Sequence, residues 1–255
     1  MTGGRAKGRG PIQEPRGRCP AQPLPEPAVI PPLVGTGPPA RPKALADPAA
    51  VAARRVLLEA PHLAPLRALA ERIRAEREAP VPEPDPLDGG VAARLLLLLE
   101  TPGPGIARTA FVSRDNPTGT AANLFGFLAE AGIARAETLI WNAVPWVIHA
   151  PGARNRAPRP GEIRQAVPYL VPLLDLMPHL AVAVLAGRVA QTLAPVLAAA
   201  RPRVAVIGVP HPSPTYVCTS STVPARIRAG LAEAARRLAA APCPPVRLAI
   251  PTGSA

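Results

Sequence analysis

Four short apolar runs in the last two thirds of the chain alternate with longer segments in which apolar residues recur at helical spacing. The runs cover Leu95–Leu99, Thr138–Val144, Leu180–Leu185 and Val204–Val209. Such runs are typical of buried strands, although consecutive leucines are also compatible with a helix. Strands that alternate with helices form parallel sheets covered on both faces. The pattern therefore predicts an α/β fold, a three-layer αβα sandwich around a central, mainly parallel four-stranded sheet.

Start and stop residues place the helices between these runs. Asp47 followed by a proline is typical of an N-cap, and helical spacing then continues over residues 48–79 with two proline interruptions. Further helices are expected over residues 120–131, 161–177 and 222–241, with another opening at Gly187. We expect the arginines of the first helical stretch, Arg54 among them, on solvated faces. The proline-rich residues 80–90 are expected to form a linker or surface loop.

The composition divides the chain of 255 residues into a folded part and two tails. Residues 1–43 are basic and rich in proline and glycine, so we expect them to be disordered, either as a basic arm for nucleic acid or as an inert extension. Residues 44–245 are expected to form one folded domain, and residues 246–255 a short C-terminal tail. The net charge of +12 favours a polyanionic partner, nucleic acid first, although the arginine, alanine and proline usage also fits a GC-rich coding bias.

Three widely separated cysteines exclude several kinds of site. The sequence has no C-x-x-C pair, since its cysteines are Cys19, Cys218 and Cys243. Three thiolates cannot build a four-thiolate zinc or iron–sulfur centre. We expect no metal and no other cofactor, and the sparse, odd count fits a reducing compartment. The longest apolar run is too short to cross a bilayer, and the N-terminus lacks the apolar stretch of a secretory signal. We therefore expect a monomer in the cytoplasm, associated with the nucleoid.

Polar residues follow three of the four predicted strands. Glu100-Thr-Pro-Gly-Pro-Gly105 follows the first strand, Asn142 lies near the end of the second, and His211 follows the fourth in a loop stiffened by three prolines. Because the carboxyl ends of parallel strands share one edge of a sheet, we expect these segments to meet at a ligand site. Taken singly, Asn142 is also compatible with closing its strand, and His211 with ordering its own loop.

Taken in order, these motifs resemble the uracil-DNA glycosylase superfamily. Asn142-Ala-Val144 and His211-Pro-Ser-Pro214 are similar to two of its motifs, and Glu100-Thr-Pro-Gly103 is similar to the Glu-small-Pro-Gly core of its family 4 and 5 forms. Residues 161–190 also resemble the family 4 pattern, and the likeness extends over about residues 95–238. It implies a DNA glycosylase that flips uracil out of DNA and hydrolyses its N-glycosidic bond, which begins base-excision repair.

The resemblance also implies a role for each motif residue. The Asn142 amide offers the donor and acceptor that complement uracil O4 and N3, whereas cytosine would mispair with it. His211 would donate to uracil O2 and stabilise the negative charge that develops on the leaving base. Phe111 would stack on the base. The remaining roles fall to Pro102 and Gly103 in the uracil pocket, and to Ser213, Thr215, Tyr216, Arg154 and Arg156 on the DNA.

At the position of the water-activating acid, the sequence departs from the pattern of the superfamily. Thr101 stands where several branches carry Asp or Asn, and a threonine can position water but cannot act as a carboxylate base. The catalytic candidates are therefore His211, Thr101 and Glu100, with Asp115 as a further carboxylate nearby. Two other functions stay open: a non-catalytic or very slow binder of uracil or abasic DNA, and an unrelated nucleotide-binding domain. Asn142 and His211 facing one pocket would favour the glycosylase.

Overall fold

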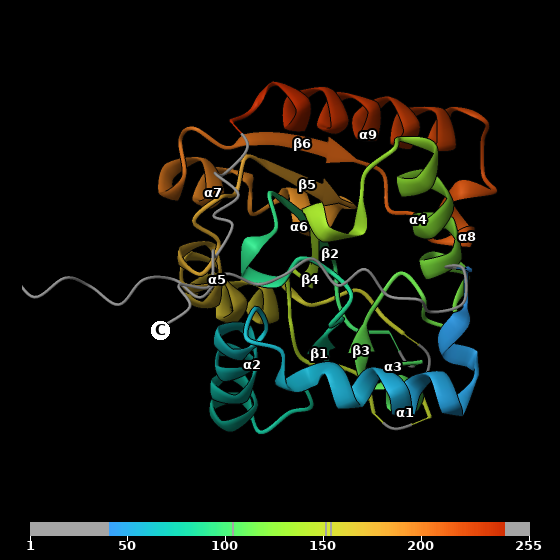
Figure 1. Ribbon diagram of the computed structural model, residues 1–255, viewed down its shortest axis with the longest axis vertical. Coiled ribbons are helices and arrows are strands. Elements are labelled where there is room, and N and C mark those ends of the chain that lie inside the picture. Colours follow the sequence, from blue (N-terminus) through green and yellow to red (C-terminus); the bar gives the residue numbers. More distant parts are fainter. Residues whose placement is uncertain (1–40, 104, 151, 154, 243–255) are drawn as a thin grey trace, which may run out of the picture.

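The computed structural model describes residues 41–103, 105–150, 152–153 and 155–242. The disordered tails predicted for residues 1–43 and 246–255 lie outside these residues, apart from residues 41–43. Within the described part, the helices and strands form a layered α/β fold (Figure 1). The fold class predicted from the apolar runs is confirmed.

The central sheet has four strands, and all of them are parallel (Figure 1). They are β2 (Leu95–Leu99), β4 (Thr138–Asn142), β5 (Val182–Ala186) and β6 (Ala205–Val209), in the spatial order β4-β2-β5-β6. After β2 the chain forms β4, which pairs with one side of β2. It then returns and forms β5, which pairs with the other side of β2. This reversal is a topological switch point, where open α/β sheets place their ligands beyond the carboxyl ends of the strands.

Helices cover both faces of this sheet. The helices of the described residues are α1 (Pro48–Val56), α2 (Ala64–Arg77), α3 (Ile106–Thr109), α4 (Gly119–Glu130), α5 (Pro160–Asp175), α6 (Arg188–Gln191), α7 (Ala194–Ala200), α8 (Pro214–Val217) and α9 (Thr222–Ala240). Of these, α2, α5 and α7 pack on one face of the sheet and α4 and α9 on the other, whereas α1 packs on Phe111. Four short 3₁₀ turns, Ala44–Ala46, Leu57–Glu59, Gly90–Ala92 and Arg135–Glu137, connect them within the described residues. The predicted helices are present, with ends shifted by one or two residues.

The leucines of β2 explain why that run forms a strand. Successive side chains of a strand point to opposite faces. Leu95 and Leu97 pack in the core under α4 and α9, whereas Leu96 and Leu98 pack in the core under α2, α5 and α7. A parallel strand buried on both faces needs apolar residues at every position, and a continuous run of leucines supplies them.

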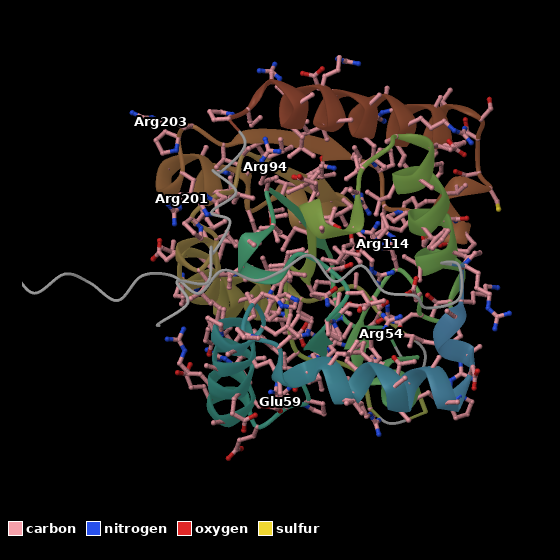
Figure 2. All side chains as sticks on the ribbon, in the orientation of Figure 1. Arg54, Glu59, Arg94, Arg114, Arg201 and Arg203 are labelled. Carbon is pink, nitrogen blue, oxygen red and sulfur yellow. The ribbon has the colours of Figure 1, made fainter. Side chains whose placement is uncertain are left out.

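The segment 80–90 is not the surface loop that its prolines suggest. It carries β1 (Glu83–Pro84), which pairs in parallel with β3 (Phe111–Val112), and two carboxylates that are almost fully buried. Asp85 is 1% exposed and Asp88 is 3% exposed. Arg54 of α1, expected on a solvated face, is buried as well. Figure 2 shows Arg54 and Arg114 among the interior side chains, whereas Arg203 projects from the periphery.

A buried network of alternating charges accounts for these differences. It joins the carboxylates Asp85, Asp88 and Asp115 to the guanidinium groups Arg54, Arg114 and Arg135. The guanidinium nitrogens of Arg54 lie 2.6 Å from a carboxylate oxygen of Asp85 and 3.0 Å from one of Asp115. A guanidinium nitrogen of Arg135 lies 2.8 Å from the same oxygen of Asp115. Buried ions need partners because their desolvation costs several kcal/mol each. The network thereby fixes α1 and the segment 80–90 to the loop that follows β3.

Asp88 makes the stability of this network dependent on pH. Burial raises the pKa of Asp88 to about 7, an effect offset in part by the charge of Arg135 and reinforced by Asp85. Between pH 4 and pH 7 the folded protein therefore holds a proton at Asp88 that the unfolded chain has released. Raising the pH through this window stabilises the unfolded state relative to the folded one.

We therefore expect the wild-type protein to lose unfolding free energy relative to Asp88→Asn as the pH rises from 5 to 7. Asparagine matches the shape of the protonated carboxyl and does not titrate. The expected relative loss is about 1 kcal/mol or more, since one pKa unit corresponds to about 1.4 kcal/mol. Urea denaturation at pH 5, 6, 7 and 8 measures it. A difference between the two proteins that stays constant with pH would refute the raised pKa.

Candidate active site

A cavity of about 350 Å³ opens at the carboxyl edge of the sheet. The turn after β2, the end of β4 and the loop after β6 all contribute to its lining, through Glu100, Thr101, Asn142 and His211. The three polar segments that the sequence places at strand ends thus meet at the switch point. A cavity of this volume is typical of a small-molecule site.

Asn142 lines this cavity with an amide that has no hydrogen-bond partner among the described residues. It is the last residue of β4, in register with Leu99 of β2, and it is 4% exposed. The backbone directly after Asn142 is held to β2, because the N–H of Ala143 donates to the carbonyl of Leu99 at 2.8 Å. Among the described residues, none forms a hydrogen bond with the Asn142 side chain. Buried amides are normally hydrogen-bonded, so this one is available to a ligand.

His211 lies on the same cavity in a defined tautomer. The backbone N–H of Ser213 donates to Nδ1 of His211 at 3.2 Å, which makes Nδ1 the acceptor nitrogen. The hydrogen of the neutral ring is therefore on Nε2. Burial lowers the pKa of His211, and the negative charge of Glu100 opposes that shift. A neutral imidazole with a hydrogen on Nε2 is a hydrogen-bond donor that brings no full charge into the site.

Gly187 allows Glu100 and His211 to lie close together. It follows β5 with a φ of 97°, a conformation that favours glycine. A Cβ atom at this position would lie 2.6 Å from Oε1 of Glu100 and 3.1 Å from Cβ of His211. The backbone N–H of Val189 donates to the same carboxylate at 3.4 Å. Glu100 is the one carboxylate that lines the cavity among the residues that the structure describes.

The turn after β2 supplies one rim of the cavity. Thr101, Pro102 and Gly103, which the motif resemblance assigns to the site, all line it. Asn155, which that analysis missed, faces the same turn, since a Cβ atom on Gly103 would meet its Nδ2 at 4.0 Å. Asp115 does not line the cavity, because its carboxylate is held in the buried network described above.

The opposite wall consists of the loop between β3 and α4, whose role the sequence analysis also missed. Ser113, Asn116 and Thr118 line the cavity from this side. The Asn116 amide donates to the carbonyl of Phe111 at 2.8 Å, and Thr118 caps α4. The hydroxyl of Ser113 donates to the buried carboxylate of Asp85. The charge network therefore supports this wall directly.

Phe111 does not have the position that its expected stacking role requires. Its side chain is fully buried against Leu45 and Val51, and it does not line the cavity. In the described residues, no Phe, Tyr or Trp lines the cavity, and its apolar surface comes instead from residues such as Val112 and Leu124. Strand alternation is the reason, because Phe111 and Val112 point to opposite sides of β3.

The residues expected on the DNA fall into two groups. The first group lies at α8. Ser213 directly precedes this helix, and its hydroxyl oxygen lies 2.9 Å from that of Thr215. Tyr216 is exposed, and its ring centroid lies 6.3 Å from that of His211. These three lie beside the cavity and do not line it. Arg156 instead pairs with Glu162 at 2.5 Å, and this contact lowers the pKa of Glu162 to about 2. The positive charge of Arg156 is therefore offset by a carboxylate of the protein itself.

Other expectations concern metals, membranes and Arg154. Arg154 lies outside the described residues. In the portions of the chain that the structure describes, no cluster of three or more His, Cys, Asp or Glu side chains is placed to hold a metal ion. None of the helices in those portions is both long and apolar enough to span a membrane.

Comparison with known proteins agrees with this geometry. The family model of the Uracil DNA glycosylase superfamily matches residues 88–234, which is more than half of the chain. The matched region begins just before β2 and ends within α9, so it contains the whole central sheet and every strand-end segment of the cavity. No curated protein matches the chain.

The environment of His211 yields a prediction that needs no substrate. We expect a pH titration followed by NMR to give His211 a pKa below the ordinary 6.5, with the hydrogen of the neutral form on Nε2. Glu100→Gln should lower that pKa further, because it removes the negative charge that favours the imidazolium ion. A neutral form with its hydrogen on Nδ1, or a pKa that rises in Glu100→Gln, would contradict the arrangement described.

Proposed function

Since the chain belongs to the Uracil DNA glycosylase superfamily, we propose that it hydrolyses the N-glycosidic bond between uracil and deoxyribose in DNA. One observation carries this proposal above the others. The free amide of Asn142 and the neutral ring of His211 line a single cavity at the switch point of the sheet. An enzyme that acts on a base in DNA must receive the flipped nucleotide in such a pocket.

Asn142 would select uracil. Its amide N–H₂ can donate to uracil O4 while its carbonyl accepts from N3–H. Cytosine presents a donor at the first position and an acceptor at the second, so both contacts would become repulsive in a buried site. Leaving buried polar groups mispaired costs about 1–3 kcal/mol each, which is sufficient for strong discrimination. The strand-end position of Asn142 supports this role because it restricts the motion of the amide.

His211 would stabilise the departing base. When the bond between C1′ and N1 breaks, the electron pair remains on uracil and its negative charge spreads to O2. An Nε2–H group directed at O2 stabilises that charge, and preorganised donors of this kind are commonly the largest contribution to catalysis. A neutral ring is suited to this task, since its donor is held in place by the Ser213 N–H before the substrate binds.

Glu100 would act on the sugar side of the reaction. The deoxyribose becomes an oxocarbenium-like cation as the base leaves, and a carboxylate stabilises such a cation. Water then adds its oxygen to C1′ and releases one proton, which Glu100 can accept, while uracil takes a proton at N1 from solvent. Thr101, on the same rim, would hold the water through its hydroxyl group.

The reaction leaves an abasic site, the starting point of base-excision repair. We propose that the protein acts on DNA as a monomer in the cytoplasm, at the nucleoid. The net charge of +12 supports a polyanionic substrate of this kind.

The first test is excision from a labelled oligonucleotide with one uracil, followed by alkaline cleavage of the abasic site. We expect Asn142→Ala and His211→Ala each to lower kcat/KM by about 10²–10³, the usual loss for a donor of this type. His179→Ala is the matched control, because His179 is exposed at the opposite edge of the sheet. If the wild-type protein retained the oligonucleotide tightly without cleavage, it would be a binder of uracil or abasic DNA, the alternative suggested by Thr101.

Glu100→Gln separates a charge effect from a structural one. Glutamine keeps an oxygen for the N–H of Val189 and a similar volume beside Gly187, but it removes the negative charge. We expect kcat for excision to fall at least about tenfold while KM changes little, since general base catalysis typically contributes 10²-fold or more. If kcat were unchanged in Glu100→Gln but strongly lowered in Thr101→Ala, the residue that acts on the water would be Thr101 and not Glu100.

A further inference from the structure

A second hollow, which we call the α1 groove, lies between α1 and α3 and has a volume of about 380 Å³. Most of its described lining residues are small and apolar, and two arginines also line it. The described residues that line it include Ala46, Ala52, Arg55, Arg108 and Pro117. The α1 side of this groove lies outside residues 88–234, the part of the chain that the family model matches.

The α1 groove and the cavity share one wall. Ile106 of α3 lines the cavity, whereas Arg108 of the same short helix lines the groove. In the adjoining loop, Asn116 and Thr118 line the cavity, whereas Pro117 between them lines the groove. A polymer with one nucleotide in the cavity would therefore reach the groove as soon as it passes over this wall.

The two arginines of the groove are free. Arg55 and Arg108 are both exposed, and neither forms an ion pair or a side-chain hydrogen bond with any residue in the described part of the chain. Their neighbour Arg54 shows the contrast, because it is bound to two buried carboxylates. Among the described residues that line the groove, none carries a carboxylate. Its positive charge is thus available to an external anion.

The groove is also held rigidly against the cavity wall. The N–H of Leu45 donates to the carbonyl of Asp115 at 3.0 Å, and Arg54 binds the carboxylate of the same residue. Leu45 and Val51 pack on the buried ring of Phe111. Arg55 follows Arg54 directly, so the buried network fixes the backbone from which the Arg55 side chain extends. Binding surfaces fixed in advance lose less conformational entropy when a ligand arrives.

We propose that the α1 groove binds the sugar–phosphate backbone of the DNA strand flanking the target nucleotide, with Arg55 and Arg108 each contacting a phosphate. Arginine forms bidentate hydrogen bonds with phosphate, and the small, apolar lining residues accommodate deoxyribose. This inference rests on the proposed function for the identity of the polymer. It assigns to α1, and to Phe111 beneath it, a part in DNA binding that the cavity does not provide.

The first test compares Arg55→Gln and Arg108→Gln with the matched control Arg203→Gln. Arg203 is an exposed arginine that precedes β6 at the opposite edge of the sheet (Figure 2). Fluorescence anisotropy of a uracil-free oligonucleotide at several KCl concentrations gives the affinity of each protein. We expect each groove variant to bind about three- to tenfold more weakly than the control. The slope of log K against log salt should fall by about one unit, because one phosphate contact is lost. In excision assays KM should rise while kcat is unchanged.

A second test identifies the contacted phosphate directly. Oligonucleotides in which one flanking phosphate is replaced by a neutral methylphosphonate are bound to the wild-type protein and to each variant. At the contacted position, neutralisation should weaken binding by the wild-type protein but not by the variant that lacks the partner arginine. If neutralisation weakened both proteins equally at every position, the groove would not contact the backbone, and a segment of the chain itself would be the better occupant.

These measurements separate the two proposals. If the protein binds DNA through Arg55 and Arg108 but excises no uracil, the groove assignment stands and the proposed function fails. If it excises uracil and the groove variants match Arg203→Gln in affinity, salt dependence and KM, the groove assignment is overturned and the proposed function stands.

Discussion

The parallel pairing of β2 with both β4 and β5 is the constraint on which the site depends. It brings the carboxyl ends of these strands to one level, with Leu99 in register with Asn142. Glu100 and Gly187 follow directly after β2 and β5 and meet beside His211. A shift of one residue in the pairing of β4 with β2 would turn the side chains of β4 to the opposite faces and remove the Asn142 amide from the cavity. The five leucines of β2, buried on both faces, make such a shift costly.

The buried charge network is the second support of the site. It acts on the wall opposite Asn142, because Ser113 and Asp115 belong to the loop that forms this wall and both bind charged residues of the network. Removing one member would leave its partners charged in the interior, which typically costs about 3–5 kcal/mol. The network therefore couples the position of α1 to the shape of the cavity, although α1 itself contributes nothing to the lining.

Sequence reasoning predicted the features that local patterns determine. The four strands, the helices between them and the meeting of polar segments at the carboxyl edge all follow from apolar periodicity and parallel topology. It failed where distant residues decide the outcome. The prolines of residues 80–90 indicate a loop, but partners 31 and 50 residues away in sequence bury Asp85. Phe111 follows the motif closely enough to suggest stacking, yet its ring packs on Leu45 and Val51. Alternation predicts that Phe111 and Val112 face opposite sides of β3, but which side faces the cavity depends on the packing of residues distant in sequence.

The proposed activity requires that the Asn142 amide and the Nε2–H of His211 bind one flipped uracil in one cavity. The most direct measurement is a crystal structure of the protein with uracil bound. We expect the base in the cavity at the switch point, with O4 and N3 within hydrogen-bond distance of the Asn142 amide and O2 within hydrogen-bond distance of His211. A base bound elsewhere, or bound in this cavity with both side chains directed away from it, would rule out these roles for Asn142 and His211.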